Sequence, residues 1–224
     1  MSAIARGGLG MRLGGVAAAG LCACLQAAAH AAPAPLPPGT RACAFDALTN
    51  DPDPAGLNVR AAPSASAPIL GRLPPAESAD AAMGTILPSF HVIGVQNGWF
   101  LIEGARYDSG YDVPRSAPKP YAGRGWVAGA RIATGLRTSS LKQAPRPDAP
   151  DVVALSGEEG GSAFGPSEVT VRRVLDCAGP WFRVEVPLNA NGVRLKPALP
   201  SDGPKDAVRG WTTGFCTQQL TTCV

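Results

Sequence analysis

The sequence has few of the residues that most often carry catalysis or bind metals. Only 2 of its 224 residues are histidine, and aromatic residues make up 6% of the chain. Because His91 is the only histidine after residue 31, a zinc site built from His and Cys is a weak hypothesis. Ser89, two residues before it, lacks the flanking glycines of a hydrolase nucleophile. We therefore expect His91 to be a structural strand residue, and we expect neither a metal nor a cofactor.

Long helical patterns are also missing. The chain contains 27 glycines and 23 prolines, and no stretch after the first thirty or so residues keeps apolar residues at helical spacing for three turns without one of them. This argues against a helical domain. The apolar run Leu13–Gln26 is short and is broken by glycines, so it does not predict a membrane span.

The first 31 residues have the composition of a signal peptide. Arg6 and Arg12 are their only charges, and small residues in Ala29-His30-Ala31 suit a signal peptidase. We predict cleavage after Ala31 and an exported, periplasmic or secreted product. An alternative interpretation takes residues 21–24 as a lipoprotein box with a lipid anchor on Cys24, although a cysteine at its second position fits that motif poorly.

Charged residues are sparse, at 17% of the chain. Without Arg6 and Arg12, 18 Lys and Arg face 17 Asp and Glu, which leaves a net charge of +1. No basic cluster resembles a phosphate-binding stripe, so nucleic acid is a poor candidate partner.

Four cysteines remain after the predicted cleavage, and an even number in an exported chain predicts two disulfides. Three connectivities are possible. Proximity in sequence favours Cys216 with Cys223, which leaves Cys43 with Cys177, but the sequence alone does not decide among the three.

Short runs of strand-forming residues, separated by turn formers, indicate a small all-β fold. The expected strands are Cys43–Leu48, Leu57–Arg60, Phe90–Val95, Trp99–Glu103, Gly125–Ala128, Val169–Asp176, Trp181–Val186 and Gly210–Thr213. We interpret residues 32–42 as a Pro-rich leader and 143–150 as a Pro-rich linker.

The chain also contains an internal repeat. The Trp-Phe pair at Trp99 recurs 82 residues later at Trp181, and the Gly-Trp pair at Trp126 recurs at Trp211. These matches predict two copies of one supersecondary unit, over 43–142 and 151–224. The stretch Leu57–Pro63 has no clean counterpart in the second copy; its nearest match is Val152–Gly161.

The first copy resembles the bacterial Src-homology-3-like (SH3-like, SH3b) domain. The resemblance rests on Leu57-Asn58-Val59-Arg60-Ala61-Ala62-Pro63, on Ile69-Leu70-Gly71, and on the Asn97-Gly98-Trp99-Phe100 and Gly125-Trp126-Val127 motifs, and it covers roughly residues 43–137. A long insert, 105–122, departs from the family pattern, and the second copy is divergent. The resemblance implies two tandem, half-open, five-stranded β-barrels.

Most polar motifs are expected to be structural. Alternation along Leu57–Arg60 places Leu57 and Val59 inward, Pro63 ends the strand, and Arg60 is expected to bond loop carbonyls or a nearby acid. The acidic residues of Asp51–Asp53 are expected to form a turn, and the same interpretation applies to the acidic and glycine residues of Gly157–Gly161, which lack the Lys-Ser/Thr ending of a phosphate loop.

Aromatic side chains around the insert are the remaining candidates for a binding site, and they are Trp99, Tyr107, Tyr111, Tyr121 and Trp126. We expect a non-enzymatic binding module, for which the resemblance implies peptidoglycan or an extended peptide as ligand. The alternative is a structural protein that binds another exported protein through a sheet edge or the insert. Trp181 and Trp211 are expected to be structural.

Overall fold

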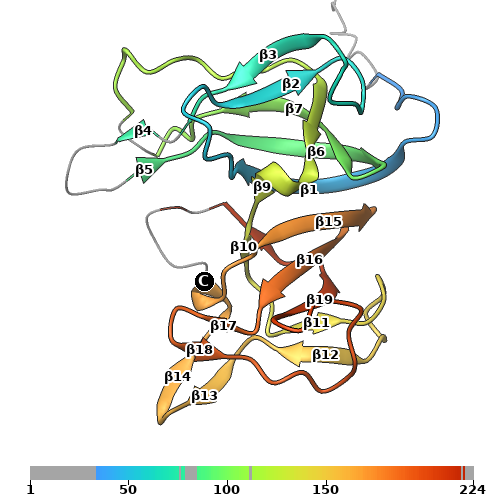
Figure 1. Ribbon diagram of the computed structural model, residues 1–224, viewed down its shortest axis with the longest axis vertical. Coiled ribbons are helices and arrows are strands. Elements are labelled where there is room, and N and C mark those ends of the chain that lie inside the picture. Colours follow the sequence, from blue (N-terminus) through green and yellow to red (C-terminus); the bar gives the residue numbers. More distant parts are fainter. Residues whose placement is uncertain (1–33, 76, 79–84, 111–112, 218, 220–224) are drawn as a thin grey trace, which may run out of the picture. The chain divides into compact units, whose positions relative to one another are not determined.

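The computed structural model describes residues 34–75, 77–78, 85–110, 113–217 and 219 (Figure 1). From Leu36 onward the chain forms one compact unit of antiparallel strands with two short 3-10 turns, η1 (Gly129–Arg131) and η2 (Pro166–Glu168). The predicted all-β class is confirmed. Within the described ranges, no helix is long and apolar enough to cross a membrane. The predicted signal peptide, the lipid anchor on Cys24, Tyr111 and Cys223 all lie outside those ranges.

A seven-stranded sheet contains the first half of the chain, in the order β3-β2-β8-β7-β6-β1-β9. Its strands are β1 (Arg41–Thr49), β2 (Leu57–Arg60), β3 (Ile69–Leu73), β6 (Ser89–Gln96), β7 (Trp99–Arg106), β8 (Gly125–Ala128) and β9 (Ile132–Ala133). A small hairpin of β4 (Glu77–Ser78) and β5 (Thr85–Ile86) is attached to it. Strand β3 forms one edge of this sheet.

A five-stranded sheet contains the second half, in the order β12-β11-β19-β16-β15. Its strands are β11 (Ser140–Lys142), β12 (Asp151–Ala154), β15 (Arg173–Ala178), β16 (Trp181–Pro187) and β19 (Ala207–Thr212). Three two-stranded pairs complete the chain, formed by β13 (Gly157–Glu159) with β14 (Ser162–Phe164), β17 (Asn189–Ala190) with β18 (Val193–Arg194), and β10 (Gly135–Leu136) with β20 (Phe215–Cys216). Residues 169–172, expected to be strand, precede β15 as irregular chain.

The strand order β3-β2-β8-β7-β6 of the first sheet recurs as β12-β11-β19-β16-β15 in the second. The register repeats as well: Val59 pairs with Gly71 and Leu141 with Val153, and a bulge follows each pair. Five strands therefore follow one connectivity twice, with corresponding residues 82 positions apart in the first two strands of each copy.

The loop between the first two strands is also duplicated. In the first copy the amides of Ala61, Ser64 and Ala67 donate to the carbonyls of Pro68, Ala62 and Ser64; in the second copy residues 82 positions later make the same three bonds. Residues 143–150, interpreted above as a linker, thus lie inside the second sheet as the loop between β11 and β12. The counterpart of Leu57–Pro63 is 139–145, a stretch whose similarity to it is too low to be recognised from the sequence.

The glycine of each Gly-Trp pair allows two strands of the same copy to pass close to each other. These strands are β8 and β2 in the first copy and β19 and β11 in the second. A Cβ atom on Gly125 would lie 2.5 Å from Val59 Cγ1, and one on Gly210 would lie 2.6 Å from Leu141 Cβ. No side chain fits at such distances without movement of the neighbouring strand. The repeated glycine therefore reflects a packing requirement that both copies share.

One continuous apolar core lies under both sheets. The Phe45 ring stacks on Phe182, with centroids 4.9 Å apart, and its edge meets Phe100 at 6.1 Å. Phe100 and Phe182 are the repeat-related residues that follow Trp99 and Trp181, and all three phenylalanines are fully buried. Strand β1 thus carries the residue that joins the cores of the two copies.

A disulfide between Cys43 and Cys177 reinforces this junction, with Cα atoms 5.7 Å apart, and agrees with the pairing that the sequence slightly favoured. Beside it, Ala44 N donates to Gly179 O at 2.9 Å and Gly179 N donates to Ala42 O at 3.0 Å. Cys216 is also disulfide-bonded. Strand β1 is therefore tied to the second sheet covalently and through its backbone.

Candidate functional site

Tyr121 lies at the edge of the first sheet, over two glycines. Its amide donates to the carbonyl of Arg72 at 3.0 Å, which fixes the chain against β3. A Cβ on Gly71 would fall 2.4 Å from the ring carbon Cδ2, and one on Gly123 would fall 2.5 Å from the hydroxyl oxygen. The ring therefore occupies the space that the missing side chains leave.

The repeat explains why this space exists. Gly71 corresponds to Val153 in the second copy, and the Val153 side chain is fully buried there. Tyr121 packs against the core from outside, in the place where the second copy has its own valine. Tyr121, predicted as a ligand contact, thus also packs against the core of the first sheet while it remains partly exposed.

Beside Tyr121 lies a surface groove of about 500 Å³. Four prolines line it together with the ring, and the full lining is Pro54, Ala55, Gly71, Arg72, Pro74, Pro75, Pro118, Lys119 and Tyr121. Proline rings and a tyrosine form rigid apolar walls that lose little conformational entropy when a ligand covers them. This groove is the candidate functional site.

Two cationic side chains that line the groove, Arg72 and Lys119, have no carboxylate partner among the described residues. Arg72 bonds only weakly to the carbonyl of Ala55, at 3.4 Å, and Lys119 is exposed. Among the described residues neither makes an ion pair, although most of the arginines in the second sheet do. An anionic group bound in the groove would therefore meet two uncompensated positive charges.

The other predicted aromatic residues do not line the groove. Trp126 is only 3% exposed, because β8 lies between β2 and β7, so its ring is not accessible to a ligand. Trp99 is half-buried at the start of β7, where it pairs with Ala128, and Tyr107 is half-buried after the end of the same strand. Of the four described candidates, Tyr121 lines the groove.

The remaining polar candidates have structural partners. Arg60 Nη1 donates to the carbonyl of Ala67 at 2.8 Å, the bond to a loop carbonyl expected of it. Asp53 Oδ1 accepts from the amide of Ala55 at 2.8 Å, which makes 51–55 a turn. The part of the chain that the structure describes contains no group of three or more His, Cys, Asp and Glu placed to hold a metal.

His91 and Ser89 do not form a catalytic arrangement. His91 Nδ1 lies 2.9 Å from Asp46 Oδ1 on β1, whereas the Ser89 hydroxyl donates to Asp108 Oδ1 at 2.7 Å. Ser89 is 4% exposed. Since the serine donates to another acid and is buried, it is not positioned as a nucleophile that His91 activates.

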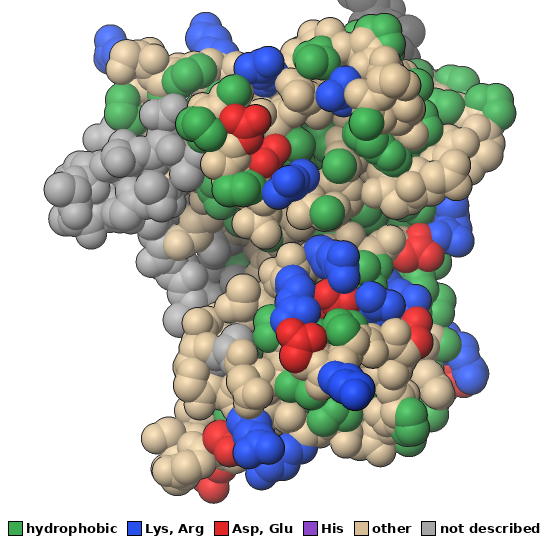
Figure 2. All heavy atoms as spheres, in the orientation of Figure 1, with side chains coloured by type: hydrophobic (Ala, Val, Ile, Leu, Met, Phe, Trp, Pro, Cys, Tyr) green, Lys and Arg blue, Asp and Glu red, His purple; other side chains and the backbone are tan. Residues whose placement is uncertain are grey.

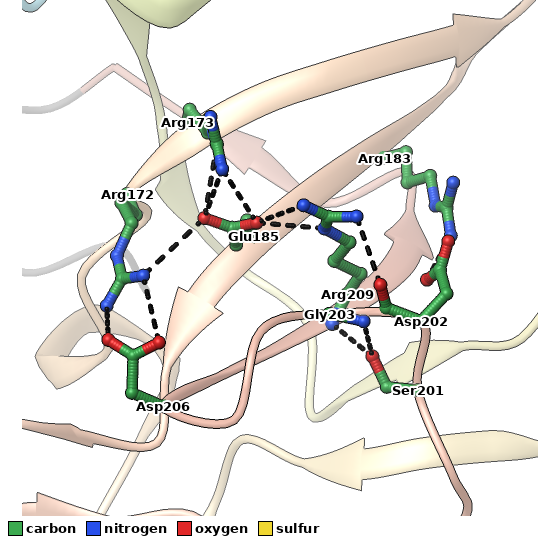
Figure 3. A network of polar contacts seen from close by, with 9 residues as sticks. All are labelled: Arg172, Arg173, Arg183, Glu185, Ser201, Asp202, Gly203, Asp206 and Arg209. Carbon is green, nitrogen blue, oxygen red and sulfur yellow. Dashed lines mark hydrogen bonds and ion pairs between the residues drawn. The ribbon is translucent and has the colours of Figure 1, made fainter.

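A cluster of arginines surrounds a buried glutamate on the second sheet (Figure 3). Glu185 is fully buried; Arg173 reaches both its oxygens at 3.1 Å, and Arg209 Nε donates to Oε2 at 2.8 Å. Arg172 lies 3.6 Å from Oε1. Because arginines donate to both oxygens of a fully buried Glu185, the carboxylate is enclosed within the cluster and is not exposed to a substrate.

Outer carboxylates complete the cluster. The hydrogen bond from Arg183 lowers the pKa of Asp202, and the hydrogen bond from Arg172 lowers the pKa of Asp206. Figure 2 shows Lys and Arg side chains interleaved with Asp and Glu over this part of the molecule. The patch is therefore a mixed-charge surface and not a basic stripe.

The cluster has a smaller equivalent in the first copy. Glu103, 82 residues before Glu185, pairs with Arg124 Nη2 at 3.0 Å, and Arg124 directly precedes Gly125 as Arg209 directly precedes Gly210. His91 takes the position of Arg173, opposite the glutamate. The polar residue His91 thus belongs to a repeated structural motif.

Sequence reasoning missed the groove prolines. Pro54, Pro74, Pro75 and Pro118 come from three separate connecting segments, and no spacing rule links them before the strand order is known. The nearest signal was the dense proline punctuation on both sides of the β2–β3 hairpin.

Comparison of the chain with protein-family models, with curated proteins and with solved structures gave no match.

Proposed function

We propose that this chain is a non-catalytic binding module of SH3-like type, exported from the cell, that holds a carboxylate-bearing extended peptide in the groove beside Tyr121. The peptides of the cell wall peptidoglycan belong to this chemical class. The observation that carries the proposal is the groove itself: rigid walls of proline and tyrosine with the two unpaired cations Arg72 and Lys119.

The groove has the features of a peptide site and lacks those of a catalytic one. Extended peptides bind well to rigid aromatic and proline walls, because little side-chain freedom is lost on contact. A charge-assisted contact from Arg72 or Lys119 to a peptide carboxylate would add orientation. No Ser, Cys, His, Asp or Glu is among the described residues that line this groove, which supports a binding role.

The family assignment is part of the proposal. Its support is the Asn-Val-Arg, Trp-Phe and Gly-Trp motifs of the first copy, together with five strands that repeat one order in both halves of the chain. In this view each half is one small half-open barrel, and export is supported by the N-terminal composition and the disulfide.

A binding assay on the oxidised, exported protein tests the function. Purified peptidoglycan sacculi should sediment the protein, and soluble wall peptides should compete. The variant Arg72→Gln/Lys119→Gln should lose most of the binding, while Arg137→Gln/Lys205→Gln, which removes the same charge from exposed residues outside the groove, should bind as the parent protein does.

Tyrosine substitutions are unsuitable for this test, because Tyr121 also packs on the core. Equal retention of both charge variants on sacculi, or no sedimentation beyond that of albumin, would rule out the groove as a wall-peptide site. Turnover of wall fragments by the parent protein would contradict the non-catalytic assignment.

A second candidate function is that of a structural protein that binds another exported protein. It is favoured by a different observation, the apolar edge of β3, where Ile69 and Leu70 are about half exposed.

A further inference from the structure

The edge strand β3 exposes two consecutive large apolar side chains. Ile69 is 48% exposed and Leu70 is 45% exposed, and they are the exposed large hydrophobic residues of the described chain. Both lie at the free edge of the seven-stranded sheet. An edge strand presents backbone groups that can pair with another chain, and apolar residues beside it increase that tendency.

A bulge leaves Leu70 outside the pairing between β2 and β3. The register runs from Val59 opposite Gly71 to Arg60 opposite Ile69, so Leu70 is the extra residue. The second copy has the same bulge, with Val152 as the extra residue between Val153 and Asp151. Leu70 and Val152 are therefore equivalent in backbone geometry as well as in repeat position.

In the second copy the chain itself covers this position. The amide of Ala198 donates to the carbonyl of Val152 at 2.7 Å, and Pro197 forms an antiparallel bridge with Val153. The Val152 side chain is only 2% exposed in this arrangement. The edge of the second sheet thus already shows what fits there: an extended segment that runs antiparallel to the strand.

In the first copy the corresponding segment docks farther along the strand. The two segments are 119–121 and 196–198, and each begins with Lys-Pro. The residue after the proline donates its amide, and it is Tyr121 in the first copy and Ala198 in the second. Tyr121 bonds to Arg72, whereas Ala198 bonds to the equivalent of Leu70. Among the described residues, no segment of the first copy bonds to the carbonyl of Leu70.

We propose that β3 is a docking site for an extended segment of another exported protein, which adds antiparallel to the strand at Leu70 and covers Ile69 and Leu70. The segment carries apolar residues and donates a backbone amide to Leu70, as 197–199 do for Val152. This is strand addition, in which backbone bonds supply affinity and side-chain contacts supply specificity. The site adjoins the groove beside Tyr121, because Gly71 and Arg72 of β3 also line that groove, but it is centred on Ile69 and Leu70, which do not.

The second copy supplies a probe for the test. A synthetic peptide with the sequence Leu195-Lys196-Pro197-Ala198-Leu199-Pro200, blocked at both ends, should bind the full oxidised protein saturably. Amide spectra should show the largest shifts at Ile69–Arg72. The same peptide with an N-methylated alanine at the Ala198 position should bind about tenfold more weakly, since it cannot donate the key hydrogen bond.

Two variants locate the site. Leu70→Glu and Ile69→Glu should each weaken peptide binding, and both residues are exposed enough for the fold to tolerate the change. Ala65→Glu, which places the same charge on the exposed loop before β3, should leave the affinity unchanged.

Three results would each overturn the proposal: absence of saturable binding up to the solubility limit of the peptide, equal binding of the N-methylated peptide, or equal binding to the Leu70→Glu variant. Loss of sacculus binding in the Arg72→Gln/Lys119→Gln variant has no bearing on it, so failure of the groove and failure of the edge are distinguishable.

Discussion

Gly125 and Gly210 precede the tryptophans of β8 and β19, and each lies where a Cβ atom would press on the first strand of its own copy. The Cβ would also approach the carbonyl of Arg60 at 3.1 Å in one copy and that of Lys142 at 3.2 Å in the other. Since a backbone carbonyl in a paired strand cannot rotate away, the neighbouring strand has to shift. The motif that revealed the repeat is thus a consequence of strand packing.

Gly210→Ala should therefore lower the free energy of unfolding by about 1–3 kcal/mol, the usual effect of added volume in a close-packed core. Urea denaturation followed by tryptophan fluorescence measures it. Gly110→Ala is the matched control, because a Cβ there meets nothing within 4 Å, and its effect should stay within about 0.5 kcal/mol. Equal stability of the two variants would contradict the packing argument.

Substitutions at Tyr121 and Gly71 should be strongly coupled in their effects on the free energy of unfolding. Tyr121→Ala removes the ring that covers Gly71 and should destabilise the protein by about 2–4 kcal/mol. Gly71→Val alone should also destabilise it, since the new side chain meets the ring. The double substitution imitates Val153 of the second copy and should recover part of the loss.

A double-mutant cycle measured by urea denaturation gives the coupling between them. Additive losses would show that the tyrosine does not fill the space above the glycine.

The strands β15, β16 and β19 hold Glu185 among arginines, whereas the equivalent strands of the first sheet hold Glu103 with a single arginine. Glu185 is fully buried, and the side chain of Glu103 is 41% exposed. The arginines around Glu185 remain 24–40% exposed, so the burial concerns the glutamate and the hydrogen bonds it accepts. Hydrogen bonds made to a buried carboxylate are worth more than those of an exposed ion pair.

Glu185→Gln should cost about 1.5–3 kcal/mol of stability, because it weakens the charge-assisted hydrogen bonds that Arg173 and Arg209 donate to a buried carboxylate. Glu103→Gln, the repeat-related control, should cost less than about 1 kcal/mol, as exposed ion pairs do. Thermal and urea unfolding of both variants measure the difference. Similar losses would show that the buried network does not act as a unit.

Particular residues show how far the sequence could predict these elements. Trp99 and Trp181 revealed the repeat because aromatic residues are rare in this chain, and strands β2 and β8 were predicted with their observed bounds. The β11–β12 unit was missed because Lys142, Gln143 and Arg146 replace the residues of the first copy, so only Ala144, Pro145, Ala149 and Pro150 match. Tyr121 was predicted as a candidate, but the groove was not, because its proline walls come from segments that only the strand order brings together.

The chain from Leu36 onward is joined across its two sheets by strand β1. This strand pairs with β6 and β9 in its own sheet, carries Phe45 between the two cores, and is bonded through Cys43 to a residue 134 positions later. A crosslink that closes so long a loop restricts the unfolded chain strongly. Stability of the first sheet therefore depends on the second.

Removal of the crosslink by Cys43→Ser/Cys177→Ser should lower the free energy of unfolding by about 2–5 kcal/mol. The stacked Phe45 and Phe182 should still hold the sheets together, so the far-ultraviolet circular dichroism spectrum should keep its β character. Urea denaturation of the double variant and of the parent protein measures the effect. An unchanged midpoint would show that the bond adds nothing to the junction.

The position of this bond also sets an order of events during biosynthesis. Cys43 leaves the ribosome long before Cys177, because synthesis proceeds from the N-terminus. The first sheet can therefore form its hydrogen bonds while the Cys43 thiol is still unpaired. Oxidation can complete the junction only when most of the chain has emerged. A truncated product that ends before β15 would lack Cys177 and would therefore carry an unpaired Cys43 thiol.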